Sequence, residues 1–167
     1  MSRYFRTAFV ALTCAYFWYY AQTYTAWHFI DNVNLIFHEA GHAIFFFAGE
    51  FFQIAAGSIF QAMLPLVFVG YFFINAQNIS AVLCLLWVGQ NLLNISVYAG
   101  DAVMMNLPLL GGDAVEHDWN YILSSLDILR YTPTIASCIY GLGIAFLVLG
   151  TASAIYFAWT KEDQARI

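Results

Sequence analysis

Five consecutive residues, His38-Glu39-Ala40-Gly41-His42, have the types and spacing needed for metal-assisted hydrolysis. On a helix, side chains four positions apart lie one above the other, so His38 and His42 can bind the same metal ion. Glu39 lies one step around the helix and can accept a proton from a water molecule that the metal activates. A chance match in a chain with four histidines has odds of roughly one in several hundred. The segment therefore predicts a Zn²⁺ site with Glu39 as the general base.

The composition predicts an integral membrane protein. Hydrophobic residues make up 62% of the 167 residues and charged residues only 9%, whereas a soluble domain carries about 25% charged residues. The length suits a single domain, 1–167. The net charge of −5 and the lack of a basic patch argue against nucleic acid as a partner, and the lipid bilayer is the expected environment. Ionisable residues are costly to bury in a bilayer, which favours a functional role for the histidines and Glu39.

The apolar segments predict about five membrane-spanning helices, since a helix of roughly 20 apolar residues crosses the hydrocarbon core. The predicted spans cover 7–28, 32–48, 57–75, 79–98 and 132–159. Asp31 is expected to cap the second of these helices, which carries the two histidines. Residues 50–56 are expected to form a short extended connector. The predicted fold class is therefore all-α.

Two further elements are predicted between the last two spans. Residues 99–117 contain a proline and two adjacent glycines, which interrupt regular structure. Irregular backbone inside a membrane is tolerated where it lines a cavity, so we expect a re-entrant loop. Asp113 and Glu116 have the spacing of a capping box that opens a helix. They predict an amphipathic helix of about 17 residues that lies at the membrane interface.

Polar side chains recur at helical spacing on three of the predicted spans. Asn34 lies on the face of the two histidines, while Gln61 is on the third span and Asn91 and Asn94 are on the fourth. Polar stripes of this kind face protein or a cavity rather than lipid, so we expect a shared interior. These amides either support the site, by steadying an oxyanion or the substrate, or form ordinary hydrogen bonds between membrane helices.

A third metal ligand must come from elsewhere in the chain, because a catalytic zinc takes three protein ligands and leaves a fourth position for water. His117 is the preferred candidate, since it lies among acidic residues beside the predicted loop. Asp113 is the chief alternative because carboxylates also bind zinc, and its other role would be that of a helix cap. Asp118 is next, either as the ligand or as a residue that orients His117.

The HEAGH helix, followed by Gly49 and Gly57-Ser58, resembles the site-2 protease family of intramembrane zinc metalloproteases. In that family a later motif of the type Asn-x-x-Pro…Leu-Asp-Gly supplies an aspartate as third ligand. The segment from Asn106 to Asp113 is similar to this motif in content, although not in spacing. The chain also resembles small bacterial membrane proteins that carry HEAGH together with a His-Asp-Trp motif.

The resemblance implies a zinc-dependent intramembrane peptidase whose metalloprotease-like core spans about 31–130. Its substrates would be membrane proteins or membrane-associated peptides, cleaved by a water molecule that the metal and Glu39 activate. Two other functions stay open. One is a non-proteolytic metal-binding membrane protein, and the other is a structural or assembly subunit of a larger membrane complex.

The resemblance to bacterial proteins also implies a location in the bacterial inner membrane. Arg3 and Arg6 then predict a cytoplasmic N-terminus, because basic residues accumulate on the cytoplasmic side. Five crossings would put 49–56 and 99–130 on that same side of the membrane.

Overall fold

The computed structural model describes residues 3–110, 112 and 115–159, and all regular structure within them is helical. The α-helices in this part of the chain are α1 (Arg3–Gln22), α2 (Phe29–Ile44), α3 (Glu50–Ile74), α4 (Asn78–Gly100), α5 (Asp118–Ser125) and α6 (Thr132–Trp159). Short 3₁₀ turns at Phe46–Ala48 and Leu129–Tyr131 precede α3 and α6. The predicted all-α class is therefore confirmed.

Three helical segments of the described residues are long and apolar enough to cross a membrane: Glu50–Ile74, Asn78–Gly100 and Leu129–Ala158. This supports membrane association, but it does not support the five predicted spans. α2 has 16 residues. At roughly 1.5 Å per residue it is about 24 Å long, shorter than a hydrocarbon core of about 30 Å. α1 has 20 residues, but it is not among the helices whose length and mean hydropathy suit a membrane span.

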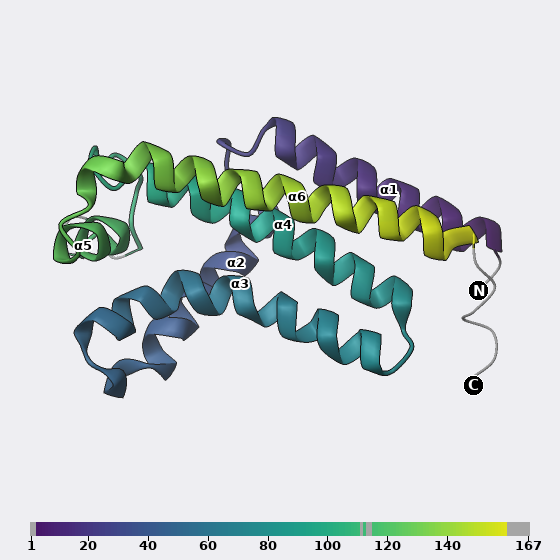
Figure 1. The fold of residues 1–167 in the computed structure, drawn as a ribbon, viewed down its shortest axis with the longest axis horizontal. Helices are drawn as coiled ribbons and strands as arrows, with labels where there is room; N and C mark the ends of the chain where they lie inside the picture. Colours follow the sequence, from purple (N-terminus) through teal and green to yellow (C-terminus); the bar gives the residue numbers. More distant parts are fainter. Residues whose placement is uncertain (1–2, 111, 113–114, 160–167) are drawn as a thin grey trace.

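α4 lies at the centre of the bundle and packs against α6, α3 and α1, whereas α2 packs mainly against α3 (Figure 1). Fully buried side chains in the apolar core between α1, α4 and α6 include Tyr20, Leu86, Leu93 and Leu147. A side chain at Gly89 would collide with Leu147 and with the backbone of Gly143. Small residues thus bring α4 and α6 into close contact, as is common between membrane helices.

The two ends of the bundle carry different parts of the chain. At one end, the Arg6 guanidinium donates a hydrogen bond to the carbonyl oxygen of Ala158, near the end of α6 (3.3 Å). α5, the start of α3 and the end of α4 lie at the opposite end (Figure 1). The start of α1 is therefore across the bundle from the start of α3, the end of α4 and α5, whereas the prediction put the N-terminus on the same side as 49–56 and 99–130. The predicted arrangement needed α2 to carry the chain back across the membrane, and α2 is too short for that.

Two helices begin earlier than predicted. α3 already starts at Glu50, so 50–56 are helical rather than an extended connector. α2 starts at Phe29 with His28 as its N-cap, and Asp31 caps it from the third helical position, as part of a capping box, rather than as the N-cap itself. There the Oδ2 atom of Asp31 accepts a hydrogen bond from the backbone N–H of His28 (2.7 Å), which satisfies one of the free N–H groups at the helix start.

Candidate metal centre

Close packing of α2 on α3 turns the two histidines towards the interior. Gly41 permits this contact, because a Cβ atom there would collide with the backbone of Ala56 on α3. His38 is buried and His42, one turn further along, is half-buried. The centroids of the two rings are 4.8 Å apart. Both imidazoles thus lie on one face of α2, as the spacing of the motif predicts.

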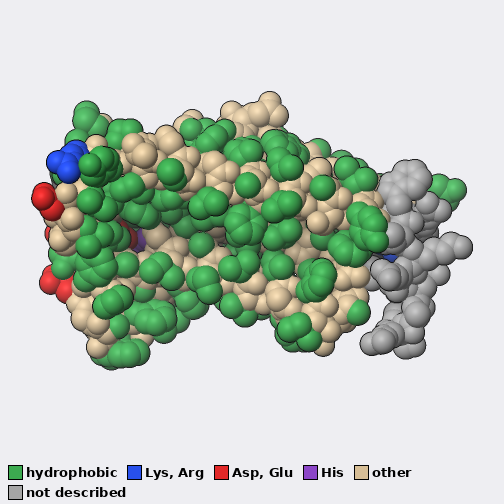
Figure 2. Space-filling model, in the orientation of Figure 1, with side chains coloured by type: hydrophobic (Ala, Val, Ile, Leu, Met, Phe, Trp, Pro, Cys, Tyr) green, Lys and Arg blue, Asp and Glu red, His purple; other side chains and the backbone are tan. Residues whose placement is uncertain are grey.

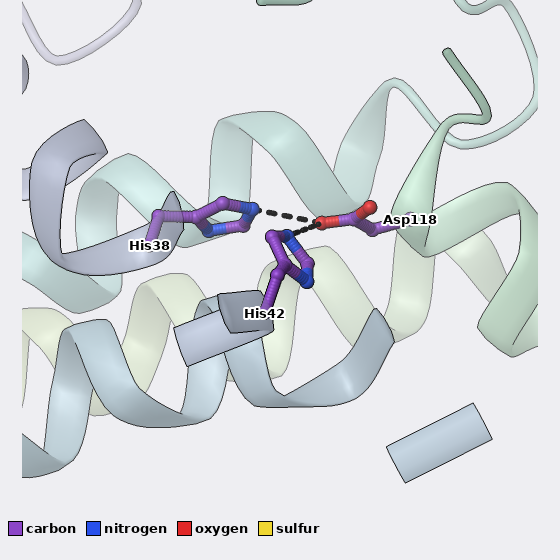
Figure 3. Close-up of side chains that lie close together, drawn as sticks. All are labelled: His38, His42 and Asp118. Atoms are coloured by element: carbon purple, nitrogen blue, oxygen red, sulfur yellow. Dashed lines mark hydrogen bonds and ion pairs between the residues drawn. The ribbon is translucent and has the colours of Figure 1, made fainter. Parts of the chain in front are cut away.

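The carboxylate of Asp118 meets both histidines (Figure 3). Its Oδ2 atom lies 2.8 Å from Nε2 of His38 and 3.2 Å from Nε2 of His42. One donor atom from each of the three side chains lies within 4.8 Å of the other two. Two imidazoles and a carboxylate form a ligand set that catalytic zinc sites use, with a fourth position left for water.

Gly57 on α3 keeps space free beside the two imidazoles. A Cβ atom at this position would lie 2.5 Å from Nε2 of His42 and 2.7 Å from Nε2 of His38. Zinc binds imidazole nitrogen at about 2.0–2.1 Å, so the missing side chain leaves room for an ion within reach of both nitrogens. The donor set and this space together fit a metal ion.

Acceptors on α3 hold the other ring nitrogens of the histidines. Nδ1 of His42 donates to the backbone carbonyl of Gln53 (2.9 Å), and Nδ1 of His38 donates to Oε1 of Gln61 (3.3 Å). A proton on Nδ1 leaves the lone pair of Nε2 free, and metal-binding histidines commonly make this second hydrogen bond. In the neutral imidazole, both Nε2 atoms can therefore bind an ion that replaces their hydrogen bonds to Asp118.

The His-Asp-Trp motif lies at the start of α5 and attaches this helix to the bundle. Asp118 supplies its carboxylate to the centre, while its backbone N–H donates to the hydroxyl of Tyr98 on α4 (3.1 Å). The indole N–H of Trp119 donates to Oγ of Ser58 on α3 (3.1 Å). These two contacts fix α5 against α3 and α4, and so direct the Asp118 carboxylate at the histidines.

The surroundings of Asp118 favour its ionised form. Burial, the largest influence, would raise the pKa of this carboxyl, but hydrogen bonds and charge interactions with His38 and His42 together lower the pKa below its usual value. A carboxylate must be deprotonated to bind a metal ion. Asp118 is therefore in the form that a metal site requires.

His117 is the preferred third ligand in the sequence-based prediction. In the structure it does not lie with His38, His42 and Asp118. It is the N-cap of α5, which begins at Asp118 and is shorter than predicted. Its Nδ1 accepts a hydrogen bond from the backbone N–H of Asn120 (3.3 Å), and its Nε2 lies 3.3 Å from Oδ2 of Asp101. With both ring nitrogens engaged, His117 holds the start of α5 instead. Asp113, the chief alternative, lies outside the described residues.

The sequence did not predict the role of Asp101, which organises the loop beside the site. Its Oδ1 accepts from the backbone N–H of Asn106 (3.0 Å), and its Oδ2 accepts from the backbone N–H of Leu107 (2.9 Å). The missed signal is an aspartate at a helix end followed by irregular chain, because a short carboxylate often accepts backbone N–H groups there.

A cavity of about 580 Å³ lies over the centre. His38, His42 and Asp118 line it together with the half-buried Glu39. The start of α3, the end of α4 and described parts of the irregular loop before α5 form much of its wall. In Figure 2, acidic side chains gather at this end of the molecule, and a histidine is visible among apolar side chains. The candidate general base and the three donors thus share one space.

The four amides predicted near the site take different places. Gln61 contacts His38 and donates to Oδ1 of Asn94 (2.8 Å), and both amides line the cavity. Asn34 and Asn91 form hydrogen bonds with other buried groups of the bundle. Since both ends of the Gln61 amide are engaged, its position favours a role in holding His38 over one in binding an oxyanion.

Comparison with known proteins finds no match: no protein-family model fits the chain, and no curated protein or solved structure is significantly similar to it. The resemblance to site-2 proteases therefore stays a prediction.

Proposed function

We propose that this chain is a zinc-dependent intramembrane peptidase that hydrolyses peptide bonds in membrane-associated protein substrates. One observation carries the proposal: His38, His42 and Asp118 converge within a cavity that Glu39 also lines. Two imidazoles and a carboxylate to hold the metal, with a second carboxylate beside them, suit metal-assisted hydrolysis. The resemblance of the HEAGH segment to site-2 proteases agrees with this assignment, in which Asp118 takes the role of the family's aspartate ligand.

The roles of the residues follow from their chemistry. His38, His42 and Asp118 would hold the ion, which when bound lowers the pKa of a water molecule and polarises the substrate carbonyl. Glu39 would accept a proton from the attacking water and return it to the leaving amine. The burial of His38 and Asp118 keeps bulk water away from the reacting groups, which strengthens each electrostatic interaction among them.

The cavity suits a short, unwound and largely apolar peptide segment. Its wall includes Leu35, Ile54 and Ile95, and none of the described residues that line it is a lysine or an arginine. Its volume of about 580 Å³ is in the usual range for small-ligand sites, roughly 300–1,000 Å³. A helix with its side chains is about 10–12 Å wide. A spanning substrate helix would therefore have to unwind locally before cleavage.

Basic residues orient the site in the membrane. Arg3 and Arg6 lie in the first turn of α1, and the sequence after α6 carries Lys161 and Arg166, whereas Arg130 flanks the other end. Basic residues accumulate on the cytoplasmic side. We therefore place the start of α1 in the cytoplasm and the cavity on the periplasmic side of a bacterial inner membrane.

Cysteine labelling tests this orientation. A cysteine at the exposed Val103, in a chain whose own cysteines are replaced, should react with a membrane-impermeant maleimide added to intact spheroplasts. Reaction only after the membrane is disrupted would reverse the orientation.

Glu39→Gln tests the peptidase proposal, since glutamine keeps the shape of the side chain but does not accept the proton. We expect unchanged Zn²⁺ content and a loss of cleavage on the order of 10²–10⁴-fold. Cleavage is measured as new peptide termini in the membrane proteins of cells that express the wild-type chain. If no terminus depends on Glu39, the peptidase proposal is overturned, while the metal site stands.

Asp118→Ala tests the metal site. Purified wild-type protein should hold one Zn²⁺ per chain by elemental analysis, and Asp118→Ala and His42→Ala should each lose it, because two donors remain of three. Asp127→Asn removes a carboxylate outside the group and should keep the ion; asparagine suits the positive φ of this residue. Full occupancy in Asp118→Ala would overturn the His-His-Asp assignment.

A further inference from the structure

A chain of amides links the candidate metal centre to Asp31, a carboxylate in the first turn of α2. The Oε1 atom of Gln61 accepts a hydrogen bond from Nδ1 of His38. The Nε2 atom of Gln61 donates to Oδ1 of Asn94 (2.8 Å). Asn94 in turn donates from Nδ2 to Oδ1 of Asp31 (3.1 Å). Asp31 is 1% exposed and is not part of the ligand group.

A second chain of amides reaches the same oxygen from another direction. The indole N–H of Trp87 donates to Oδ1 of Asn34 (3.0 Å), and Nδ2 of Asn34 donates to Oε1 of Gln90 (2.9 Å). Gln90 then donates from Nε2 to Oδ1 of Asp31 (3.0 Å). An indole N–H only donates, so it fixes the orientation of both amides that follow it.

The Asp31 carboxylate accepts hydrogen bonds from four donors. Besides Gln90 and Asn94, the Tyr20 hydroxyl donates to Oδ1 (2.8 Å) and the backbone N–H of His28 donates to Oδ2 (2.7 Å). Amide nitrogens and a backbone N–H have no acceptor capacity. Asp31 is therefore the common end point of both chains.

The direction of the first chain determines the state of His38. Because each amide has one donating end and one accepting end, a nitrogen turned to Asp31 leaves the oxygen of Asn94 facing Gln61. Gln61 must then face Asn94 with its nitrogen and His38 with its oxygen. An oxygen opposite Nδ1 requires the proton on Nδ1. In the neutral imidazole that would bind an ion, the lone pair then lies on Nε2, whose hydrogen bond to Asp118 the ion would replace.

We propose that Asp31 is a positioning residue of the metal centre, which sets through Asn94 and Gln61 the nitrogen of His38 that carries the proton. This inference rests on the metal site of the proposed function, although not on peptidase activity. With the Gln61 amide reversed, its NH₂ group would face Nδ1 and the proton of His38 would move to Nε2. The lone pair needed for the ion would then point away from the other two ligands.

Two amides of α4 that both donate to Asp31 provide a matched test. Asn94→Leu interrupts the chain to His38, whereas Gln90→Met interrupts the chain to Trp87 with a side chain of similar size. We expect Asn94→Leu to weaken Zn²⁺ binding by about 10- to 100-fold, the usual loss when an outer contact of a metal ligand is removed. Gln90→Met should bind Zn²⁺ as the wild type does. Affinities are measured by competition with a chromogenic chelator, on purified full-length protein in detergent.

A rescue experiment separates control of the His38 proton from loss of stability. An ionised glutamate at position 61 has only acceptor oxygens, so Gln61→Glu keeps the proton on Nδ1 without a donor at position 94. The double variant Asn94→Leu/Gln61→Glu should therefore regain near wild-type affinity. Asp31→Asn should weaken binding and be rescued in the same way. Asp31→Asn is compared only if circular dichroism shows a helical protein. If it does not, the comparison of Asn94→Leu with Asn94→Leu/Gln61→Glu tests the role of Asp31.

Each outcome has a distinct meaning. Equal affinities in Asn94→Leu and wild type, equal losses in Asn94→Leu and Gln90→Met, or no rescue by Gln61→Glu would each overturn the role of Asp31. Wild-type protein that binds no Zn²⁺ would overturn the proposed function as well. A chain that binds Zn²⁺ and cleaves nothing would overturn only the peptidase activity.

Discussion

Glycines are used differently in two regions of the molecule. Between α4 and α6, a Cβ atom at Gly89 would meet Leu147 and one at Gly150 would meet Leu86, so leucine side chains fill the space beside these glycines. Between α2 and α3, a Cβ atom at Gly57 would meet nitrogen atoms of both histidines. The space beside this glycine is lined by groups that can bind an ion.

The α4–α6 contact depends on shape, whereas the region of α2, α3 and α5 depends on the direction of hydrogen bonds. Apolar packing loses stability when volume is added or removed. A buried hydrogen-bond network fails when one donor or acceptor is removed or reversed. Substitutions in the two regions should therefore separate stability from metal binding.

Gly57→Ala is expected to have the largest effect, the loss of Zn²⁺ binding. The added methyl group would occupy the space beside both Nε2 atoms, and the imidazoles would have to turn away. Helix content should be kept, because the collision involves the ends of side chains rather than backbone. Zn²⁺ per chain and circular dichroism measure the two quantities. Gly70→Ala on the same helix, where a Cβ meets no atom within 4 Å, is the control and should keep the ion. Retained Zn²⁺ in Gly57→Ala would contradict the predicted ion position.

Gly150→Ala should lower the free energy of unfolding by about 1–3 kcal/mol, the usual effect of overpacking, and leave Zn²⁺ content unchanged. Its Cβ would lie 2.7 Å from a methyl carbon of Leu86. Gly141→Ala lies on the same helix and meets no atom within 4 Å, so it should not destabilise the protein. Denaturant titration in detergent measures both variants. Equal stability of the two would show that α4 and α6 are not packed as described.

His117→Ala should lower the free energy of unfolding by about 1 kcal/mol, because it removes the N-cap of α5. One Zn²⁺ per chain should remain at saturating metal, since Asp118 and the two histidines are intact. His117→Asn, which restores a capping acceptor, should recover much of the stability. A loss of Zn²⁺ in both variants would instead identify His117 as a ligand.

Thr151→Val should have the smallest effect, about 0.5–1.5 kcal/mol of unfolding free energy, and none on metal affinity. It removes the acceptor of the Trp18 indole N–H (2.9 Å) in the packing between α1 and α6. Thr13→Val is the control, because the hydroxyl of Thr13 is exposed and bonds only within α1. A change in Zn²⁺ affinity in Thr151→Val would show that the two regions are coupled.

The histidine pair and its face were predictable because helical periodicity depends only on local spacing. The same periodicity predicted that polar residues of three helices face one interior. Gln61 does form a hydrogen bond with Asn94, and it also contacts His38. The number of spans was not predictable in this way. The apolar run from Phe45 to Phe47 gives no sign that α2 ends at Ile44, where the chain tightens into a 3₁₀ turn.

The third donor was harder to identify because His117 and Asp118 are neighbours. Successive side chains on a helix point about 100° apart, so the exact start of α5 decides which of them faces the histidines. The capping pattern of Asp113 and Glu116 indicated an earlier start. The observed start depends on contacts such as that of the Asp118 N–H with Tyr98, which local sequence does not reveal.

The distance along the chain between the donors determines when the site can form. Asp118 follows His38 by 80 residues. During synthesis both histidines therefore emerge long before the carboxylate that completes the set, and α3 and α4 are made in between. A growing chain with only α1 to α4 lacks one of the three donors. Under the proposed function, the enzyme stays inactive at least until α5 has been made, when only α6 of the described α-helices remains to be added.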